Sequence, residues 1–231
     1  RIGALQIISM LDDDFEYFYQ RAGFGPRLDA VSPSQHQIES YRRKLPSKLL
    51  SYWDTYGFAG YGQGLFWMTD PDEYAEVLNA WIYGTRFYRQ DEYSVVGRTA
   101  FGKLMVWGKR TGFSLNIHCP LGMIFPHEDS IEMSDEEGDF QVETWLSGMQ
   151  KNMLDLPDVD ERPLFERCLS LLGPLGREEM YGFVPALAMG ASKRLDRLQR
   201  VNAVEHLMFL AQLTEPTVML DINKEAGRLG L

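Results

Sequence analysis

The chain has 231 residues, of which 45% are hydrophobic and 24% are charged. This composition is typical of soluble globular proteins and excludes the disordered and fibrous classes. The formal net charge of −10 at pH 7 disfavours a nucleic-acid-binding role, because a negative field repels phosphate groups.

The sequence also bears on location. No apolar run approaches the roughly 18 residues that a membrane span needs, and no signal peptide opens the chain. We therefore expect a cytoplasmic protein that does not bind membranes. We also expect the natural start to lie near Met10, so that residues 1–9 do not pack into the core.

Helices are predicted for the first part of the chain. Acidic residues 12–14 precede aromatic residues at helical spacing, which predicts a short helix over residues 12–21. Ser34 followed by Gln37 fits the capping box of a second helix.

Residues 45–81 organise the expected fold. Pro46 opens an amphipathic helix that should end at Gly57, because glycine adopts the backbone conformation that terminates helices. A glycine-spaced turn then leads into a short apolar strand. Asp70 followed by Pro71 is a typical start for the next helix, with Asp as the N-cap.

The pattern then changes to short β-rich runs separated by glycines. These runs cover residues 93–96, 103–107, 113–117 and 123–125, which predicts an antiparallel meander with helices on one side. We expect an α+β fold in which N-terminal helices pack on this β-meander and a mainly helical C-terminal region follows.

The C-terminal region shows weaker signals. Its pattern predicts helices over residues 139–149 and 164–172, with an exposed loop over residues 155–162, marked by Pro157 and Pro163, between them. A short strand-like run near Tyr181 and a long last helix ending before Pro216 complete the expected elements.

The negative charge is concentrated in one segment. Residues 128–162 contain twelve acidic residues against two basic ones, which accounts for the whole excess of the chain. Such a segment is either a solvated loop or a surface that attracts a basic partner. For the second interpretation the candidate partner-binding residues are Glu128, Asp129, Glu132, Asp135, Glu136, Glu137, Asp139, Asp158 and Asp160.

We expect no catalytic, cofactor-binding or metal site. A cluster of His127, Glu128 and Asp129 is disfavoured as a metal site because consecutive side chains rarely converge on one ion. His118 and Cys119 are adjacent strand residues, which point to opposite faces and do not form a catalytic pair. Cys119 and Cys168 are expected to be buried, reduced thiols.

Several stretches resemble a known family. Three stretches resemble the GAD-like domain at the front of bacterial type VI secretion immunity proteins. They are LPSKLLSYWDTYGFAGYGQGLFW, DPDEYAEVLNAW and VVGRTAFGKLMVW. The C-terminal domain of the same family is resembled by LGPLGREEMYGFVPALAMG followed by VNAVEHLMFLAQL. The resemblance implies a GAD-like domain over residues 12–125 and a C-terminal immunity domain over residues 126–231, although the two could also form one continuous core.

The resemblance also implies a function. Members of this family are non-enzymatic inhibitors that protect a bacterium from a toxin, which in the best known branch is a DNase. With this family in view, the acidic segment is expected to bind a nuclease effector with a basic surface and to occlude or distort its active site. The alternative is an enzyme or small-molecule-binding domain with a pocket lined by Tyr61, Trp67, Trp107 and Tyr181.

Overall fold

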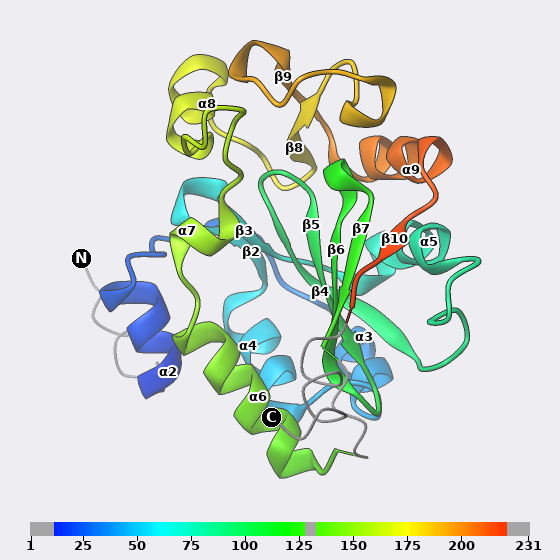
Figure 1. The fold of residues 1–231 in the computed structure, drawn as a ribbon. Helices are drawn as coiled ribbons and strands as arrows, with labels where there is room; N and C mark the ends of the chain where they lie inside the picture. The colour runs from blue at the N-terminus through cyan, green and yellow to red at the C-terminus, as the bar shows by residue number, and fades with distance from the viewer. Residues whose placement is uncertain (1–11, 128–132, 221–231) are drawn as a thin grey trace, which may run out of the picture.

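The computed structural model describes residues 12–127 and 133–220 (Figure 1). The expected start near Met10, and three of the candidate partner-binding residues, Glu128, Asp129 and Glu132, lie outside the described residues.

Within the described residues, eight strands form one sheet in the order β1-β2-β3-β4-β5-β6-β7-β10. All neighbouring strands are antiparallel except β7 and β10, which are parallel. The strands are β1 (Leu28–Val31), β2 (Phe58–Tyr61), β3 (Phe66–Met68), β4 (Tyr93–Thr99), β5 (Lys103–Gly108), β6 (Gly112–His118), β7 (Met123–Pro126) and β10 (Thr217–Val218). The predicted meander is therefore confirmed as β4 to β7, at the centre of a larger sheet.

Helices cover both faces of this sheet. They are α2 (Asp13–Glu16), α3 (Gln35–Tyr41), α4 (Ser47–Tyr56), α5 (Pro71–Ile82), α6 (Asp135–Ser147), α7 (Lys151–Leu154), α8 (Phe165–Leu172) and α9 (Ala203–Leu213). The expectation of helices on one side only was wrong, because successive residues of β5 pack into different clusters: Met105 with α4 and α6, and Leu104 with α5 and α9. A sheet buried on both faces needs an apolar layer on each.

The predicted boundaries of α4 and α5 are confirmed. Pro46 is the N-cap of α4, and Gly57 ends that helix with a φ of 74°. A side chain at Gly57 would place its Cβ 2.6 Å from the backbone oxygen of Val31, so the close approach of β1 also requires glycine. The Asp70 side chain accepts a hydrogen bond from the backbone N–H of Asp72, with Pro71 in the first turn of α5.

The C-terminal region contains a second sheet. β8 (Glu179–Phe183) and β9 (Leu198–Asn202) pair antiparallel. Residues 198–202 are thus a strand, where the sequence pattern had suggested a longer last helix. α9 begins at Ala203, where the Asn202 side chain accepts a hydrogen bond from the N–H of Glu205.

Both core clusters draw residues from each side of the expected boundary at residue 125. One contains Phe15 together with Tyr181, and the other contains Tyr74 together with Leu207. The backbone N–H of Tyr181 also donates to the oxygen of Ala100 at 2.8 Å. The division into domains 12–125 and 126–231 stays a prediction, and the described residues pack around shared apolar clusters.

None of the helices in the described ranges has the length and apolar character needed to cross a membrane.

Candidate partner-binding surface

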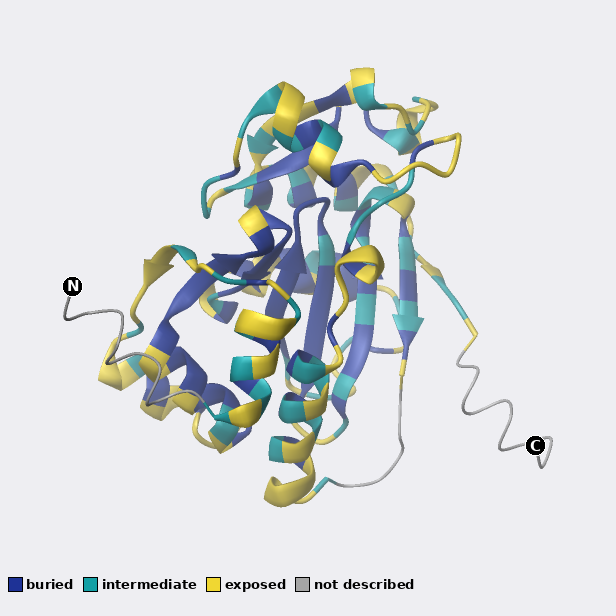
Figure 2. Ribbon diagram, turned by 90° about the vertical axis from the view of Figure 1, so that its left-hand side faces the viewer, coloured by how far each residue is buried: buried dark blue, intermediate teal, exposed yellow. Residues whose placement is uncertain are grey.

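Four helices follow one side of the molecule, which we call the helical face. It comprises α2, α6, α7 and α8 with the loop of residues 155–164, on the left in Figure 1 and toward the viewer in Figure 2. Large apolar side chains are exposed along it: Phe140 on α6 (66%), Met153 on α7 (62%) and Leu171 on α8 (63%). Exposed large apolar residues on a folded surface often mark interaction sites.

The first turn of α6 holds the acidic run that the sequence singled out. Helix α6 begins four residues earlier than expected, because Ser134 and Glu137 form a capping box at its N-terminus. Asp135 and Glu136 are exposed and form no ion pair with any described residue. These two carboxylates are therefore available to a partner, whereas Glu137 is used by the cap.

Asp139 has a structural role that the sequence did not reveal. Its Oδ1 accepts a hydrogen bond of 2.7 Å from the backbone N–H of Lys48, and its Oδ2 accepts one of 2.8 Å from the Ser47 hydroxyl. These groups lie in the first turn of α4, whose N-cap Pro46 has no side chain to offer. Asp139 thus caps a helix 91 positions away.

Lys48 ties three helices of this region together. Its Nζ lies 2.8 Å from Asp12 Oδ2, next to α2, and 2.9 Å from Glu143 Oε1 on α6. The Tyr52 hydroxyl donates to the same Asp12 carboxylate. Burial raises the pKa of Asp12, but the hydrogen bonds from Lys48, the Phe15 N–H and Tyr52 outweigh it and leave the pKa below its usual value.

Beside α2 the surface is hollowed and acidic. A hollow of about 490 Å³ is lined by Asp13, Asp14, Glu16, Tyr17, Arg21 and Ser147. Burial, and then the nearby charges of Glu143 and Asp12, raise the pKa of Asp14. The helical face therefore extends the negative charge of α6 onto α2, which packs against it.

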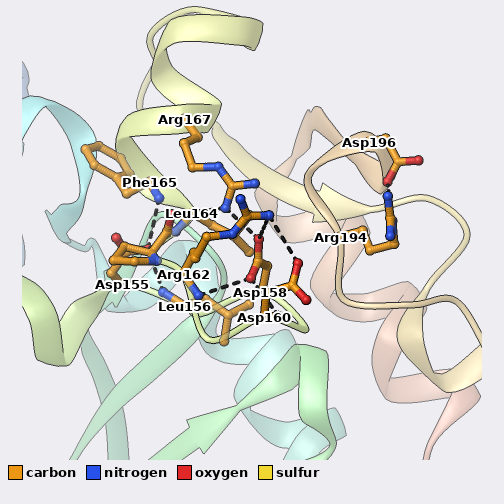
Figure 3. Close-up of polar contacts among 11 residues, drawn as sticks. Asp155, Leu156, Asp158, Asp160, Arg162, Leu164, Phe165, Arg167, Arg194 and Asp196 are labelled. Carbon is orange, nitrogen blue, oxygen red and sulfur yellow. Dashed lines mark hydrogen bonds and ion pairs between the residues drawn. The ribbon is translucent and has the colours of Figure 1, made fainter.

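The loop of residues 155–162 is closed by internal hydrogen bonds, and residues 159–162 are exposed as predicted, whereas Asp158 is buried. Asp158 is only 2% exposed, and its carboxylate accepts hydrogen bonds from Arg167 Nη1 at 2.6 Å and from the backbone N–H groups of Asp160 and Arg162 (Figure 3). The bond from Arg167 is the main reason that the pKa of Asp158 lies well below its ordinary value. Asp158 therefore holds the loop and is not presented to a partner, whereas the side chain of Asp160 is 64% exposed.

Asp155 closes the same loop from its other end. Its Oδ1 accepts hydrogen bonds from the backbone N–H groups of Leu156, Leu164 and Phe165, at 2.6, 3.2 and 3.0 Å (Figure 3). The last two belong to the start of α8, whose N-cap Leu164 has no capping side chain. Burial raises the pKa of Asp155 in spite of these bonds.

The aromatic residues of the alternative pocket lie in the apolar core. Tyr61, Trp67, Trp107 and Tyr181, which the alternative interpretation placed around a pocket, are at most 1% exposed and belong to the main apolar cluster. No group of three or more His, Cys, Asp or Glu residues within the described ranges is arranged to hold a metal ion.

His118 and the two cysteines have shifted pKa values, and burial is the main cause. Burial, together with the charges of Lys103 and His127, lowers the pKa of His118 to about 4. Both cysteines are buried and free. Burial raises the pKa of Cys168 to about 12 and raises that of Cys119 as well, so both thiols are protonated at neutral pH.

Comparison with known proteins gives two family matches and a structural one. Residues 14–121 match the model of the GAD-like domain, and residues 139–214 match the model of the C-terminal region of the T6SS immunity protein Tdi1. No protein with a curated description matches the chain in sequence. The crystal structure of Atu4351 from Agrobacterium tumefaciens has a similar fold, with a TM-score of 0.78 and 21% identity over 88% of this chain and 91% of that one.

Proposed function

This chain belongs to the type VI secretion immunity proteins that join a GAD-like domain to a Tdi1-type C-terminal domain, and we propose that it neutralises its effector by binding it through the helical face. The observation that carries this proposal is the acidic first turn of α6, with Asp135 and Glu136 unpaired among the described residues and Phe140 exposed beside them. An immunity domain implies a cognate toxin as partner.

The composition of the helical face suits a protein partner. Interfaces use a few apolar or aromatic anchors surrounded by polar groups, and Phe140, Met153 and Leu171 are spaced along α6, α7 and α8 as such anchors. The carboxylates around them favour fast encounter with a positively charged surface.

The negative charge of the helical face supports a nuclease as the toxin. A nuclease carries basic residues where it binds phosphates, and carboxylates of an inhibitor can occupy that surface in place of the phosphates. We therefore propose a DNase effector whose active site is covered or distorted by this chain. In this account the chain itself catalyses no reaction, since inhibition requires only a complementary surface.

A charge-neutralising variant tests the proposal. In Asp135→Asn/Glu136→Gln, association with the cognate effector should be about 3- to 10-fold slower at low ionic strength. The difference in association rate between variant and wild type should shrink as the salt concentration is raised, because salt screens the electrostatic attraction that speeds association of the wild type. Stopped-flow or surface-based kinetics at several salt concentrations measure both effects.

A matched control removes the same charge elsewhere. Glu76 on α5 and Glu205 on α9 are exposed and lie on the opposite side of the sheet. Glu76→Gln/Glu205→Gln should bind the effector at nearly the wild-type rate. Equal rates for both double variants would remove the first turn of α6 from the interface.

A further inference from the structure

A second hollow lies on the helical face, between residues on both sides of the expected domain boundary. Its volume is about 410 Å³. From the N-terminal side the turn between β2 and β3 contributes Gly62 and Leu65, and from the C-terminal side α7, the closed loop and the start of α8 complete the wall. Such a hollow exists only where the two halves of the chain are packed together.

The lining of this hollow combines apolar residues with three carboxylates. Leu65, Pro157, Pro163 and Phe165 supply the apolar lining. The carboxylates are those of Asp155, Glu161 and Glu166.

These three carboxylates have oxygen atoms that can still accept hydrogen bonds. All three hydrogen bonds to Asp155 go to Oδ1, so Oδ2 accepts none of them. Glu161 and Glu166 are exposed and form no ion pair with any residue in the described ranges. Burial and the charge of Glu166 raise the pKa of Asp155 in spite of its backbone hydrogen bonds.

Among the residues that line the hollow, the one cation does not pair with these carboxylates. Lys151 lines the hollow, but its Nζ lies over the ring of Phe24 at 5.8 Å from the centroid. It forms no ion pair with a described carboxylate.

We propose that this hollow receives a lysine or arginine side chain of the bound effector, with the aliphatic stem against Leu65, Pro157 and Phe165 and the charged head among the three carboxylates. A metal ion is a poorer occupant, because these carboxylates do not form a group of metal-binding geometry within the described residues. Long cationic side chains bury their stems on apolar surface while the head stays with polar groups, which matches a lining that combines apolar residues with carboxylates.

The proposal rests on the proposed function for the source of the cation, and it adds a specific anchor to it. The first turn of α6 lies at an open surface and should govern encounter. The hollow can enclose one side chain, so its interactions form only in the docked complex and should govern dissociation.

Dissociation kinetics of Glu161→Gln/Glu166→Gln test this assignment. Both residues are exposed, so the variant should fold with an unchanged midpoint of thermal unfolding. The complex with the effector should dissociate about 10- to 100-fold faster, with association slowed far less. The control Glu178→Gln/Glu205→Gln changes two exposed carboxylates outside the hollow and should dissociate as wild type does. Wild-type dissociation of the Glu161/Glu166 variant would overturn the anchor while leaving the proposed function standing.

A second measurement does not depend on the effector. N-acetyl-arginine amide, titrated into the wild-type protein at millimolar concentration, should shift the amide NMR signals of residues 62–65, 161–162 and 164–166. N-acetyl-glutamine amide should not. If the wild-type protein fails to bind the effector, the proposed function fails, and this titration alone then decides on the hollow. Absence of arginine-specific shifts there would overturn it.

Discussion

Arg98 offers the sharpest test of how the two halves of the chain are joined. It is a fully buried residue of β4, with 0% exposure, and no carboxylate of the described residues pairs with it. Its Nε donates to the Tyr74 hydroxyl at 2.7 Å, and its Nη2 donates to the backbone oxygens of Arg177 at 2.7 Å and Glu179 at 2.9 Å. The guanidinium also lies 5.2 Å from the ring of Trp67.

The substitution Arg98→Lys keeps the charge and removes the planar fork. An ammonium group cannot reach the Tyr74 hydroxyl and both backbone oxygens at once, so one or two of these buried acceptors lose their donor. Hydrogen bonds to charged groups contribute about 1.5 to 3 kcal/mol each, and a buried charge that loses partners adds to the cost. We expect the free energy of unfolding to fall by about 3 to 5 kcal/mol.

Urea unfolding followed by tryptophan fluorescence and circular dichroism measures this change. With a slope of about 2 to 3 kcal/mol per M, the midpoint of urea unfolding should fall by about 1 to 2.5 M. The control Arg200→Lys affects an exposed side chain whose Nη1 donates to the Pro174 oxygen at 3.1 Å, and it should cost less than about 1 kcal/mol. A midpoint for Arg98→Lys as high as that of Arg200→Lys would show that the hydrogen bonds from Arg98 to Tyr74 and to the backbone of residues 177 and 179 do not hold β4 against β8.

Three further predictions follow from local geometry. Hydrogen bonding lowers the pKa of Asp12 in the folded state, so its contribution to stability is present at neutral pH and is lost as the pH falls below about 4. In Asp12→Asn, the urea midpoint should therefore change less with pH in this range. A pH dependence equal to that of the wild type would contradict the assignment. Gly57→Ala should cost about 3 kcal/mol because it combines a φ of 74° with a backbone clash, whereas Gly84→Ala, with a φ of 78° and open space, should cost about 1 kcal/mol in thermal unfolding. Cys119 and Cys168 should resist a thiol reagent such as 5,5′-dithiobis(2-nitrobenzoate) until urea unfolds the chain, because both are buried with raised pKa values, and rapid labelling of the native protein would contradict their placement.

Local signals made part of the fold predictable. The start of α5 at Asp70 and Pro71 depends on contacts within one turn, and the meander of β4 to β7 depends on short connections between neighbouring strands. Strands β1 and β10 could not be predicted in this way. β1 is mostly exposed and β10 has only two residues, so each is defined by its partner strand and not by its own pattern.

The candidate surface was predictable in charge but not in the roles of single residues. A count of carboxylates finds the acidic segment, but the sequence does not show that Asp139 caps α4 or that Asp158 holds a loop through Arg167. Both roles depend on groups brought close by the tertiary fold. The exposed set on α6 is consequently smaller than the sequence suggested, and Asp135 and Glu136 remain as its free members.

Hydrogen–deuterium exchange of the chain, free and bound to its effector, tests the central claim most directly. We expect slower exchange in the complex over α6 and over residues 151–166, with exchange of α5 and α9 unchanged. Protection confined to α5 and α9, with the helical face exchanging as in the free protein, would contradict it.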